Sequence, residues 1–567
     1  NVIIRNDMDL FLYFFDSLFE QIICCSTPIL RLAGVKNGNL SSCFIMDPSL
    51  SSVDDVHSAM FNELPKLLQS QSGVGVNVTK FGTDGKNILN CLKVMDSQIE
   101  YYNDANIRPV SVAAFMELWH FQILDFLSAK HPENPDRCSS LYQGVCVPDL
   151  FFKMYENDPT DIWYLFDPQT AQNLSNLYGS DFETEYLNLV KKNAHVGSIS
   201  VKSLMYLLIN TIVKTGTPYV IMKDSCNKHH YTETQGAAIS CSNLCAEIIQ
   251  QPKNNISVCN LVNICLPTCL HKMTLPDLDT NELEECSFDI QKLQKAVEVA
   301  VIVVNCAILG GSLPTRSAVL GQSSRSIGIG VQGLADVFAM MGLGYLDEMS
   351  GAIDSFIFEH LYYFAVKASH EIVSLGGGPS FHGWRSTKWG KGKFHWEDWD
   401  VREMSMSVSK NEWDVLRNGI MERGIFNSQL VALMPTVGSS QLTGYSESFY
   451  PYFANMSSKV SNKEEIMRAN MLFLKYIRPE DVPVIRAHSG DVMSFPQELR
   501  KKYRVFMSAF DYDPAEYMKR ARQRAPFVDH SQSLTLFLSE KLVKNASYLK
   551  NLLVLGYELG LKTVLYY

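Results

Sequence analysis

The sequence predicts an α/β fold, and three observations lead to that prediction. Helix-like and strand-like segments alternate along the whole chain, with glycine and proline between them. Apolar residues make up 46% and charged residues 19% of the 567 positions, a composition typical of a globular protein with a large core. No repeat with a period of about 20 to 50 residues is present, which argues against a solenoid or a propeller.

Charge and hydropathy exclude two broad classes of partner. The formal net charge is −10 and no run of five basic residues occurs, so duplex nucleic acid is not expected to bind. The most apolar stretch, Val299 to Leu309, is shorter than the roughly 20 residues of a membrane span and contains Asn305. We therefore expect a buried helix there and no membrane association.

The chain starts at Asn1, so we expect it to begin inside a longer protein.

Periodicity places two helices, and composition places two linkers. Apolar spacing predicts a helix over residues 284–308 and another over 333–341. The acidic segment 272–285 and the glycine- and tryptophan-rich segment 376–400 are predicted to be surface excursions.

Fourteen cysteines with irregular spacing indicate a reducing compartment rather than a disulfide scaffold. Two C-x3-C pairs, Cys241/Cys245 and Cys265/Cys269, offer four thiols for a zinc site. Zinc knuckles favour two intervening residues, and Cys265 lies in an apolar run, so ordinary buried thiols are favoured. The zinc site stays open as an alternative.

A G-x-G-x-x-G pattern occurs at Gly328, Gly330 and Gly333. A dinucleotide site needs this pattern directly after a solid apolar strand, and only Ile327 and Ile329 are strand-like here. The glycines are better explained by close backbone packing ahead of a helix that begins near Leu334.

The segment Ser242 to Glu247 carries polar groups with catalytic potential. In an extended conformation Asn243, Cys245 and Glu247 would share one face, whereas on a helix they would diverge. An amide, a thiol and a carboxylate side by side suit nucleophilic and acid–base chemistry. A strand with a solvated polar face is the competing interpretation, and the pattern alone favours it.

Two further thiols lie in extended segments, Cys43 within Leu40 to Ile45 and Cys259 within Val258 to Leu261. If a barrel brought them together, they could cycle between dithiol and disulfide and supply two electrons. Inert core thiols are the competing interpretation. Downstream, residues 434–441 combine a proline, a threonine, a glycine and two serines, which predicts a turn that opens a helix and could bind a phosphate. An ordinary helix cap explains that turn equally well.

Taken together, ordered blocks of the sequence resemble the large subunit of class I ribonucleotide reductase. The blocks are SSC ending at Cys43, NLCAE at 243–247, Cys259, SIGIGVQGLADVF at 326–338, PTVGSSQ at 435–441, FVDHSQS at 527–533 and GLKTVLYY at 560–567. Further segments resemble the herpesvirus members, most of all the gammaherpesvirus branch. These are CCSTP from Cys24, LFFK from Leu150, WYLFDP from Trp163, FNSQ from Phe426 and NKEE from Asn462.

The resemblance implies a ten-stranded α/β barrel with a central finger loop. Residues 1–42 would be the end of an N-terminal helical region, and residues 43–567 the catalytic barrel. The ATP-binding cone and the C-terminal redox tail of the family are expected to lie outside this chain.

The resemblance also implies catalytic roles. Cys245 would carry a transient thiyl radical that abstracts the ribose 3′ hydrogen, Glu247 would take the 3′-hydroxyl proton, and Asn243 would bind the sugar. Cys43 and Cys259 would supply the reducing equivalents and end as a disulfide. Tyr566 and Tyr567 would relay the radical, and no metal ligand is expected in this chain.

The implied substrate is a ribonucleoside diphosphate. The positions expected to bind it are Thr27, Ser42, Cys43, Gly73, Arg108, Asn243, Leu244, Cys245, Ala246, Glu247, Pro435, Thr436, Val437, Gly438 and Ser439.

The implied partner is a small subunit that holds a diiron tyrosyl radical, and the implied reductant is of the thioredoxin or glutaredoxin type. A reducing location in the host cytoplasm is expected. The alternative hypothesis is an interaction protein that sequesters host DNA cytosine deaminases, alone or beside catalysis, and redistributes such nuclear partners.

Two segments depart from the family pattern. Residues 79–90 are shorter than the family's first regulatory loop, and residues 102–111 lack the glycines usual in the second while keeping Arg108. We therefore expect weak control of substrate choice by nucleotide effectors.

Overall fold

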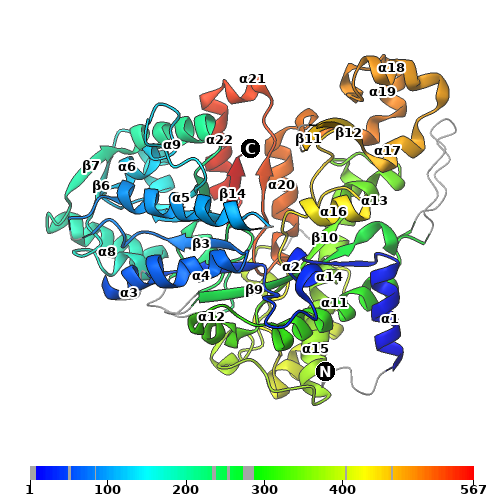
Figure 1. Cartoon of the computed structure of the whole chain (residues 1–567), viewed down its shortest axis with the longest axis horizontal. Coiled ribbons are helices and arrows are strands. Elements are labelled where there is room, and N and C mark those ends of the chain that lie inside the picture. Colours follow the sequence, from blue (N-terminus) through cyan, green and yellow to red (C-terminus); the bar gives the residue numbers. More distant parts are fainter. Residues whose placement is uncertain are drawn as a thin grey trace.

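Figure 1 shows the computed structural model of the chain. The structure describes residues 8–48, 53–83, 85–106, 108–232, 238–251, 256–271, 287–401, 405–461 and 464–566. The predicted linker 272–285 lies outside the described residues.

Five parallel strands form the first half of the main sheet. They are β2 (Cys43–Met46), β3 (Gly73–Asn77), β4 (Ser111–Glu117), β5 (Tyr142–Val147) and β8 (Tyr219–Met222), paired in that order. Their residues are buried almost throughout, as parallel strands covered on both faces must be.

The second half is a matching parallel set. Strand β9 (Ile256–Cys265) pairs with β10 (Ile327–Gln332), and bridges from Ile329 to Val431 and from Leu433 to Gln532 add two more extended segments. The second of these continues into β13 (Thr535–Leu536), which pairs with β14 (Thr563–Tyr566).

Antiparallel pairings join the two halves at both seams. Cys43 of β2 lies opposite Cys259 of β9, and Thr563 of β14 lies opposite Ile221 of β8. The circuit therefore closes into the expected ten-stranded α/β barrel. Strand β1 (Ile23–Cys25) adds to the outer edge of β9, and two small sheets, β6 (Ile162–Leu165) with β7 (Gly197–Ser200) and β11 (Met456–Ser461) with β12 (Glu464–Ala469), stand apart.

Helices of the N-terminal half lie around the first set of strands, on the left of Figure 1. They are α3 (Val53–Ser58), α4 (Leu64–Gln69), α5 (Ile88–Ala105), α6 (Ile123–Ser128), α7 (Asp149–Asn157), α8 (Gly179–Lys191), α9 (Val201–Thr215) and α10 (Lys223–Lys228). They are preceded by α1 (Met8–Phe19) and α2 (Thr27–Leu32).

The remaining helices belong to the second half. They are α11 (Ile290–Gly310), α12 (Arg316–Gly321), α13 (Leu334–Met340), α14 (Glu348–Ser374), α15 (Lys410–Arg423), α16 (Val437–Thr443), α17 (Met471–Tyr476), α18 (Val482–Ala487), α19 (Gln497–Lys502), α20 (Pro514–Arg524), α21 (Glu540–Val543) and α22 (Ala546–Glu558). Helices α17, α18 and α19 form a lobe at the upper right of Figure 1.

Helix α11 confirms the apolar helix predicted in this region, although it begins at Ile290. The Asp289 side chain caps it by accepting a hydrogen bond from the Lys292 amide at 2.9 Å. It is the one helix of the described residues with the length and hydropathy of a membrane span, and 61% of its apolar window is buried inside the molecule. Asn305 is fully buried and exchanges hydrogen bonds of 3.0 and 2.8 Å with Asn427, which explains a polar residue in this core helix.

The glycines of the G-x-G-x-x-G pattern confirm the close-packing interpretation. A Cβ on Gly328 would lie 2.5 Å from Leu261 Cδ2, and one on Gly330 would lie 2.4 Å from Met434 Sδ. Gly333, with a φ of +77°, then caps α13, close to the predicted start at Leu334.

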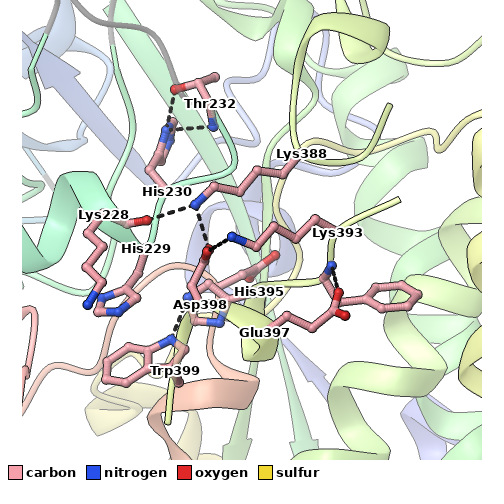
Figure 2. A network of polar contacts seen from close by, with 12 residues as sticks. Lys228, His229, His230, Thr232, Lys388, Lys393, His395, Glu397, Asp398 and Trp399 are labelled. Carbon is pink, nitrogen blue, oxygen red and sulfur yellow. Dashed lines mark hydrogen bonds and ion pairs between the residues drawn. The ribbon is translucent and has the colours of Figure 1, made fainter. Parts of the chain in front are cut away.

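The prediction that residues 376–400 form a surface excursion is wrong. Trp389, Phe394 and Trp399 of this segment are buried, because their ring area outweighs the local glycine and charge content. Figure 2 shows how the segment is tied down: Lys388 Nζ donates to Asp398 at 2.5 Å and to the Lys228 carbonyl at 2.8 Å. Both ion-pair partners are nearly inaccessible to solvent.

The inner faces of the strands enclose a second, smaller core. Alternate residues of the strands contribute to it, together with the segment 238–249 that runs inside the barrel. Its buried members are Cys43, Ile45, Ala113, Phe115, Cys146, Ile221, Cys226, Ile239, Cys241, Ile248, Ile249, Cys259, Leu261, Ala432 and Met434.

Candidate active site

The segment 238–249 occupies the barrel interior because strand β3 leaves room for it. A Cβ on Gly75 would lie 1.7 Å from the Ser242 carbonyl oxygen, and one on Gly73 would lie 3.0 Å from Leu244 Cδ2. Asn77 on the same strand donates to Ser240 Oγ at 2.9 Å. Two glycines and one amide of β3 thus position this finger segment.

The finger does not carry its polar groups on an extended face, so that prediction is wrong. The Ala246 amide donates to the Asn243 carbonyl at 3.2 Å, and Ala246 has a φ of +61°, so the backbone makes a tight turn. The Asn243 side chain accepts from the Ile248 amide at 3.0 Å and stabilises the turn from inside. Turn geometry, not strand alternation, brings the amide and the carboxylate to the same sulfur.

That sulfur belongs to Cys43. Asn243 Nδ2 donates to Cys43 Sγ at 3.2 Å, and Cys43 Sγ lies 3.7 Å from Glu247 Oε1. Cys259 lies opposite Cys43 in the ladder between β2 and β9. Directly opposed residues of antiparallel strands have Cα atoms about 4.5 to 5.5 Å apart, which is within disulfide reach. Both thiols are free in this structure.

Cys245 lies at the tip of the finger turn. Leu244 and Cys245 keep partial solvent access, whereas Asn243, Ala246 and Glu247 are buried. Burial raises the pKa of the Cys245 thiol well above its usual value, Glu247 raises it further, and Arg108 lowers it. The thiol is therefore protonated and neutral at pH 7.

Glu247 has the electrostatics of a base poised near neutrality. Burial raises its pKa to about 7, and hydrogen bonds from Asn243 and Cys43 offset part of the shift. Among the described residues its Oε2 atom has no hydrogen-bond partner. A buried carboxylate oxygen without a partner is available to a ligand.

Sequence reasoning missed a second carboxyl, Glu447. Burial raises its pKa to about 7, and its charge acts on Cys245. It follows α16 in a loop whose local sequence, Tyr445-Ser446-Glu447, carries no motif, so no sequence signal would have identified it.

The predicted anion-binding turn is present as the start of α16. Thr436 precedes the helix, and its hydroxyl accepts from the Ser448 amide at 2.7 Å. Thr27 of α2 faces this turn, since a Cβ on Gly438 would lie 3.8 Å from Thr27 Oγ1. In the described part of the chain the buried hydroxyls of Ser26 and Ser42 have no hydrogen-bond partner. Helix-start amides and free hydroxyls together suit a phosphate.

Of the remaining predicted site residues, Arg108 has a described side chain and the two C-terminal tyrosines do not. Arg108 is partly buried and donates to the Gln71 carbonyl at 3.0 Å. Burial lowers the pKa of its guanidinium, and a thiolate at Cys43 or Cys245 would raise it. Tyr566 ends β14, where it pairs with Leu536, and only its backbone is described. Tyr567 lies outside the described residues.

The zinc hypothesis is wrong for the cysteines that suggested it. Cys241 and Cys245 lie in the finger, whereas Cys265 ends β9 and Cys269 lies in the short helical turn after it. No group of three or more metal-ligating side chains occurs among the residues that the structure describes.

Comparison with known proteins gives one family over most of the chain. The family model described as "Ribonucleotide reductase, barrel domain" matches residues 41–567. A protein named "Ribonucleoside-diphosphate reductase large subunit" from Saimiriine herpesvirus 2 (strain 11) is 56% identical over 567 residues, which are 100% of this chain and 73% of that protein.

This chain belongs to the ribonucleotide reductase large-subunit family. Proteins of the same name from Human herpesvirus 8 type P (isolate GK18) and Epstein-Barr virus (strain B95-8) are 54% and 43% identical, over 99% and 100% of this chain and 71% and 70% of their own lengths. The resemblance to the gammaherpesvirus branch is therefore confirmed. The three relatives all carry the reductase name, and none is named as an interaction protein.

Proposed function

We propose that this chain is the large subunit of a viral ribonucleoside-diphosphate reductase, which converts ribonucleoside diphosphates to 2′-deoxyribonucleoside diphosphates for DNA synthesis. The observation that carries the proposal is the finger turn, which holds Asn243 and Glu247 against Cys43 while Cys259 lies opposite Cys43. Family membership supports the reaction class.

In this proposal the chain's own residues divide the reaction between them. Cys245, as a thiyl radical, takes the 3′ hydrogen atom of the ribose, and Glu247 takes the 3′-hydroxyl proton. The 2′-hydroxyl leaves as water with a proton from the Cys43–Cys259 dithiol, which supplies two electrons and ends as a disulfide. Asn243 holds the sugar through its amide, Glu247 returns its proton to the 3′ oxygen, and Cys245 gives the hydrogen atom back to C3′, which restores the thiyl radical.

The substrate would enter with its diphosphate on the turn Pro435 to Ser439 and on the free hydroxyls around it. Thr27 and Ser42 support that placement, since Thr27 faces Gly438 and the Ser42 hydroxyl is buried without a partner in the described part of the chain. Gly73 leaves space beside Leu244, and Arg108 supplies a positive charge near the thiols.

The proposal includes partners outside this chain. A small subunit with a diiron tyrosyl radical would supply the oxidising equivalent, which Tyr566 and Tyr567 would pass on to Cys245. A thioredoxin- or glutaredoxin-type dithiol would re-reduce the disulfide. The thirteen cysteines of the described residues are all free, which supports a reducing location such as the host cytoplasm. The relatives named above give the deaminase-binding alternative no support.

The test is reduction of CDP by the purified full-length protein mixed with its small subunit. We expect dCDP formation that needs both subunits and a dithiol. Failure of the complete mixture to form dCDP, with a small subunit shown to carry its radical, would contradict the proposal.

A further inference from the structure

The two thiols of the proposed redox pair have different surroundings. Cys43 is 9% exposed and Cys259 is 1% exposed. Cys43 accepts a hydrogen bond from Asn243, but its sulfur also lies 3.7 Å from the Glu247 carboxylate. A thiolate on Cys43 would therefore be repelled by its neighbour once Glu247 is ionised.

Ser326 lies beside Cys259 on the neighbouring strand. Ile327 of β10 is opposite Asn260 of β9 in a parallel ladder, so the preceding residues, Ser326 and Cys259, are also neighbours. The same face of β10 continues with Gly328, whose Cβ position lies 3.6 Å from Cys259 Sγ. The Ser326 hydroxyl is thereby positioned as a hydrogen-bond donor toward Cys259, and it lowers the pKa of that thiol.

His530 lies behind Ser326. Its Nε2 atom is 2.8 Å from Ser326 Oγ, and its Nδ1 atom accepts a hydrogen bond from the Ile249 amide at 3.3 Å. Because Nδ1 is an acceptor, Nε2 must carry the ring hydrogen and donate it to Ser326. The Ser326 hydroxyl hydrogen is then free to point at Cys259.

The imidazole keeps this role at every working pH. Burial lowers the pKa of His530 to about 3, and the Lys562 ammonium lowers it further, so the ring stays neutral. Lys562 Nζ donates to the His530 carbonyl at 2.6 Å and to the Asp529 carbonyl at 2.9 Å, which fixes the segment. It also lies 3.0 Å from Nε2 of His395, whose ring lies beside Trp399 in Figure 2.

The charged and titratable groups that face Cys259 come from three other elements. They are Cys43 on β2, Glu247 on the finger and Asp529 in the segment that precedes His530. Both carboxylates disfavour the thiolate form of Cys259. A hydroxyl donor directed at the sulfur is therefore needed to stabilise that thiolate.

We propose that Ser326 and His530 form a hydrogen-bond relay that stabilises a thiolate on Cys259. When the Cys43–Cys259 disulfide is re-reduced, the external thiolate therefore attacks Cys43, and Cys259 is the leaving group. The inference rests on the proposed function, because in turnover the reductase reaction is what produces this disulfide. Ser326 and His530 are positioning residues in this account, acting on the sulfur and not on the substrate.

The exchange balances as two thiol–disulfide steps. A thiolate of an external dithiol attacks Cys43 Sγ, the bond between the two sulfurs breaks, and Cys259 leaves with the electron pair toward the Ser326 hydroxyl. The second thiolate of the external reductant then displaces Cys43. The reductant loses two electrons, and its two protons end on Cys43 and Cys259.

The test uses the full-length protein oxidised with one equivalent of diamide. Limiting glutathione, a monothiol, starts the exchange, N-ethylmaleimide stops it, and peptide mass spectrometry reads which label each cysteine carries. We expect glutathione on Cys43 and N-ethylmaleimide on Cys259 in at least tenfold excess over the reverse pattern. A wild-type ratio near one would overturn the relay.

Variants separate the relay from simple packing. Ser326→Ala and His530→Leu should reduce the label ratio at least threefold, and both should slow reduction by dithiothreitol. Ser326→Thr keeps a hydroxyl, and His530→Gln keeps an acceptor for Ile249 and a donor for Ser326, so both should retain the wild-type ratio. Ser531→Ala removes another buried hydroxyl, bonded to Thr563 at 2.8 Å, and should leave the ratio unchanged.

An unchanged ratio in folded Ser326→Ala would also overturn the relay. If Ser326→Ala fails to fold, the same ratio measured in the His530→Leu and His530→Gln pair decides the outcome. Symmetric labelling in a protein that still reduces CDP would overturn the relay alone. A diamide-oxidised protein in which Cys43 and Cys259 are not joined would overturn both the relay and the proposed function.

Discussion

Cys43 and Cys259 face each other across the antiparallel seam between the two halves of the barrel, although they lie far apart in the sequence. The seam is also where the finger turn reaches the strands, because Asn243 donates to Cys43 at 3.2 Å. The proposed redox pair and the proposed radical site are thus held by one junction of three segments.

Replacing Cys245 with Ser should abolish nucleotide reduction. A serine hydroxyl resists one-electron oxidation at the potential that suits a thiol, so no usable radical forms. The hydroxyl is close to the thiol in size, so folding and CDP binding should be retained; thermal melting and equilibrium dialysis with CDP check both. Substantial turnover by the pure variant would remove Cys245 from the radical role.

Glu247 should set the acid limb of the pH–rate profile. Its pKa is raised to about 7, so the carboxylate that acts as base is lost as the pH falls through that value. We expect kcat/KM to fall about tenfold per pH unit below the midpoint. Glu247→Gln should lose this limb together with most activity, whereas Glu447→Gln should keep it. A limb that persists in Glu247→Gln would assign it to another group.

The raised pKa of Glu247 also predicts that the folded protein loses stability as the pH rises, whereas the activity increases. Because the folded-state pKa is above the ordinary carboxyl value of 4.5, ionising Glu247 costs stability progressively between about pH 4.5 and 7, and the full cost persists above that range. Glu247→Gln should therefore raise Tm at pH 8 and change it little at pH 4. A lower Tm at pH 8 would contradict the burial of an ionised Glu247.

Gly75→Ala should displace the finger. Its Cβ would lie 1.7 Å from the Ser242 carbonyl oxygen, and backbone at that distance must move. We expect a loss of about 1 to 3 kcal/mol of stability and a fall in kcat of at least a hundredfold. Gly197→Ala on β7, where the nearest atom is an ordinary 3.6 Å away, is the matched control. Equal behaviour of the two variants in urea melts and CDP assays would show that the finger does not depend on Gly75.

Substrate choice should respond weakly to nucleotide effectors. Residues 102–105 belong to the last turn of α5, and Asn103 exchanges hydrogen bonds with Val110 at 3.1 and 2.6 Å, which ties the two sides of the second loop together. A cavity of about 650 Å³ beside the first loop is lined in part by Phe61, Lys80 and Lys86 and leaves room for a nucleotide. The prediction therefore concerns how effector binding alters substrate choice, and not whether an effector binds.

The assay for this prediction is a matrix of the four ribonucleoside diphosphates against ATP, dATP, TTP and dGTP with the assembled enzyme. We expect relative rates to change by less than a factor of ten. A tenfold change corresponds to about 1.4 kcal/mol of coupling, and an effector-dependent change of that size or more would show that the second loop still transmits the signal.

Local patterns predicted the elements that depend on local physics. The apolar spacing of α11 and the turn that opens α16 follow from side chains close in sequence. The glycine pattern of β10 indicated close packing, but its partners Leu261 and Met434 lie far away in the sequence. The packing of segment 376–400 was not predicted, because burial of Trp389 and Trp399 depends on partners that composition cannot reveal.

The candidate site was predictable in its residues but not in its geometry. Alternation suggested an extended Asn243-to-Glu247 face, whereas the left-handed Ala246 makes a turn that alanine rarely adopts. Ser326 and His530 lie in blocks that carry the family resemblance, 326–338 and 527–533, and Glu447 lies in none of those blocks. Each acquires its local role only from strands and loops that the barrel brings together. The family resemblance supplied the pairing of Cys43 with Cys259, which spacing alone could not.

One measurement tests the central claim most directly: a single turnover of CDP by the full-length protein and its small subunit without any external reductant. The account predicts about one dCDP per active chain, with an equal amount of Cys43–Cys259 disulfide recovered by peptide mapping. The variants Cys43→Ser and Cys259→Ser, which cannot form this disulfide, should form much less than one dCDP per chain. Formation of dCDP while both thiols stay reduced, or with a disulfide at another cysteine pair, would contradict the account.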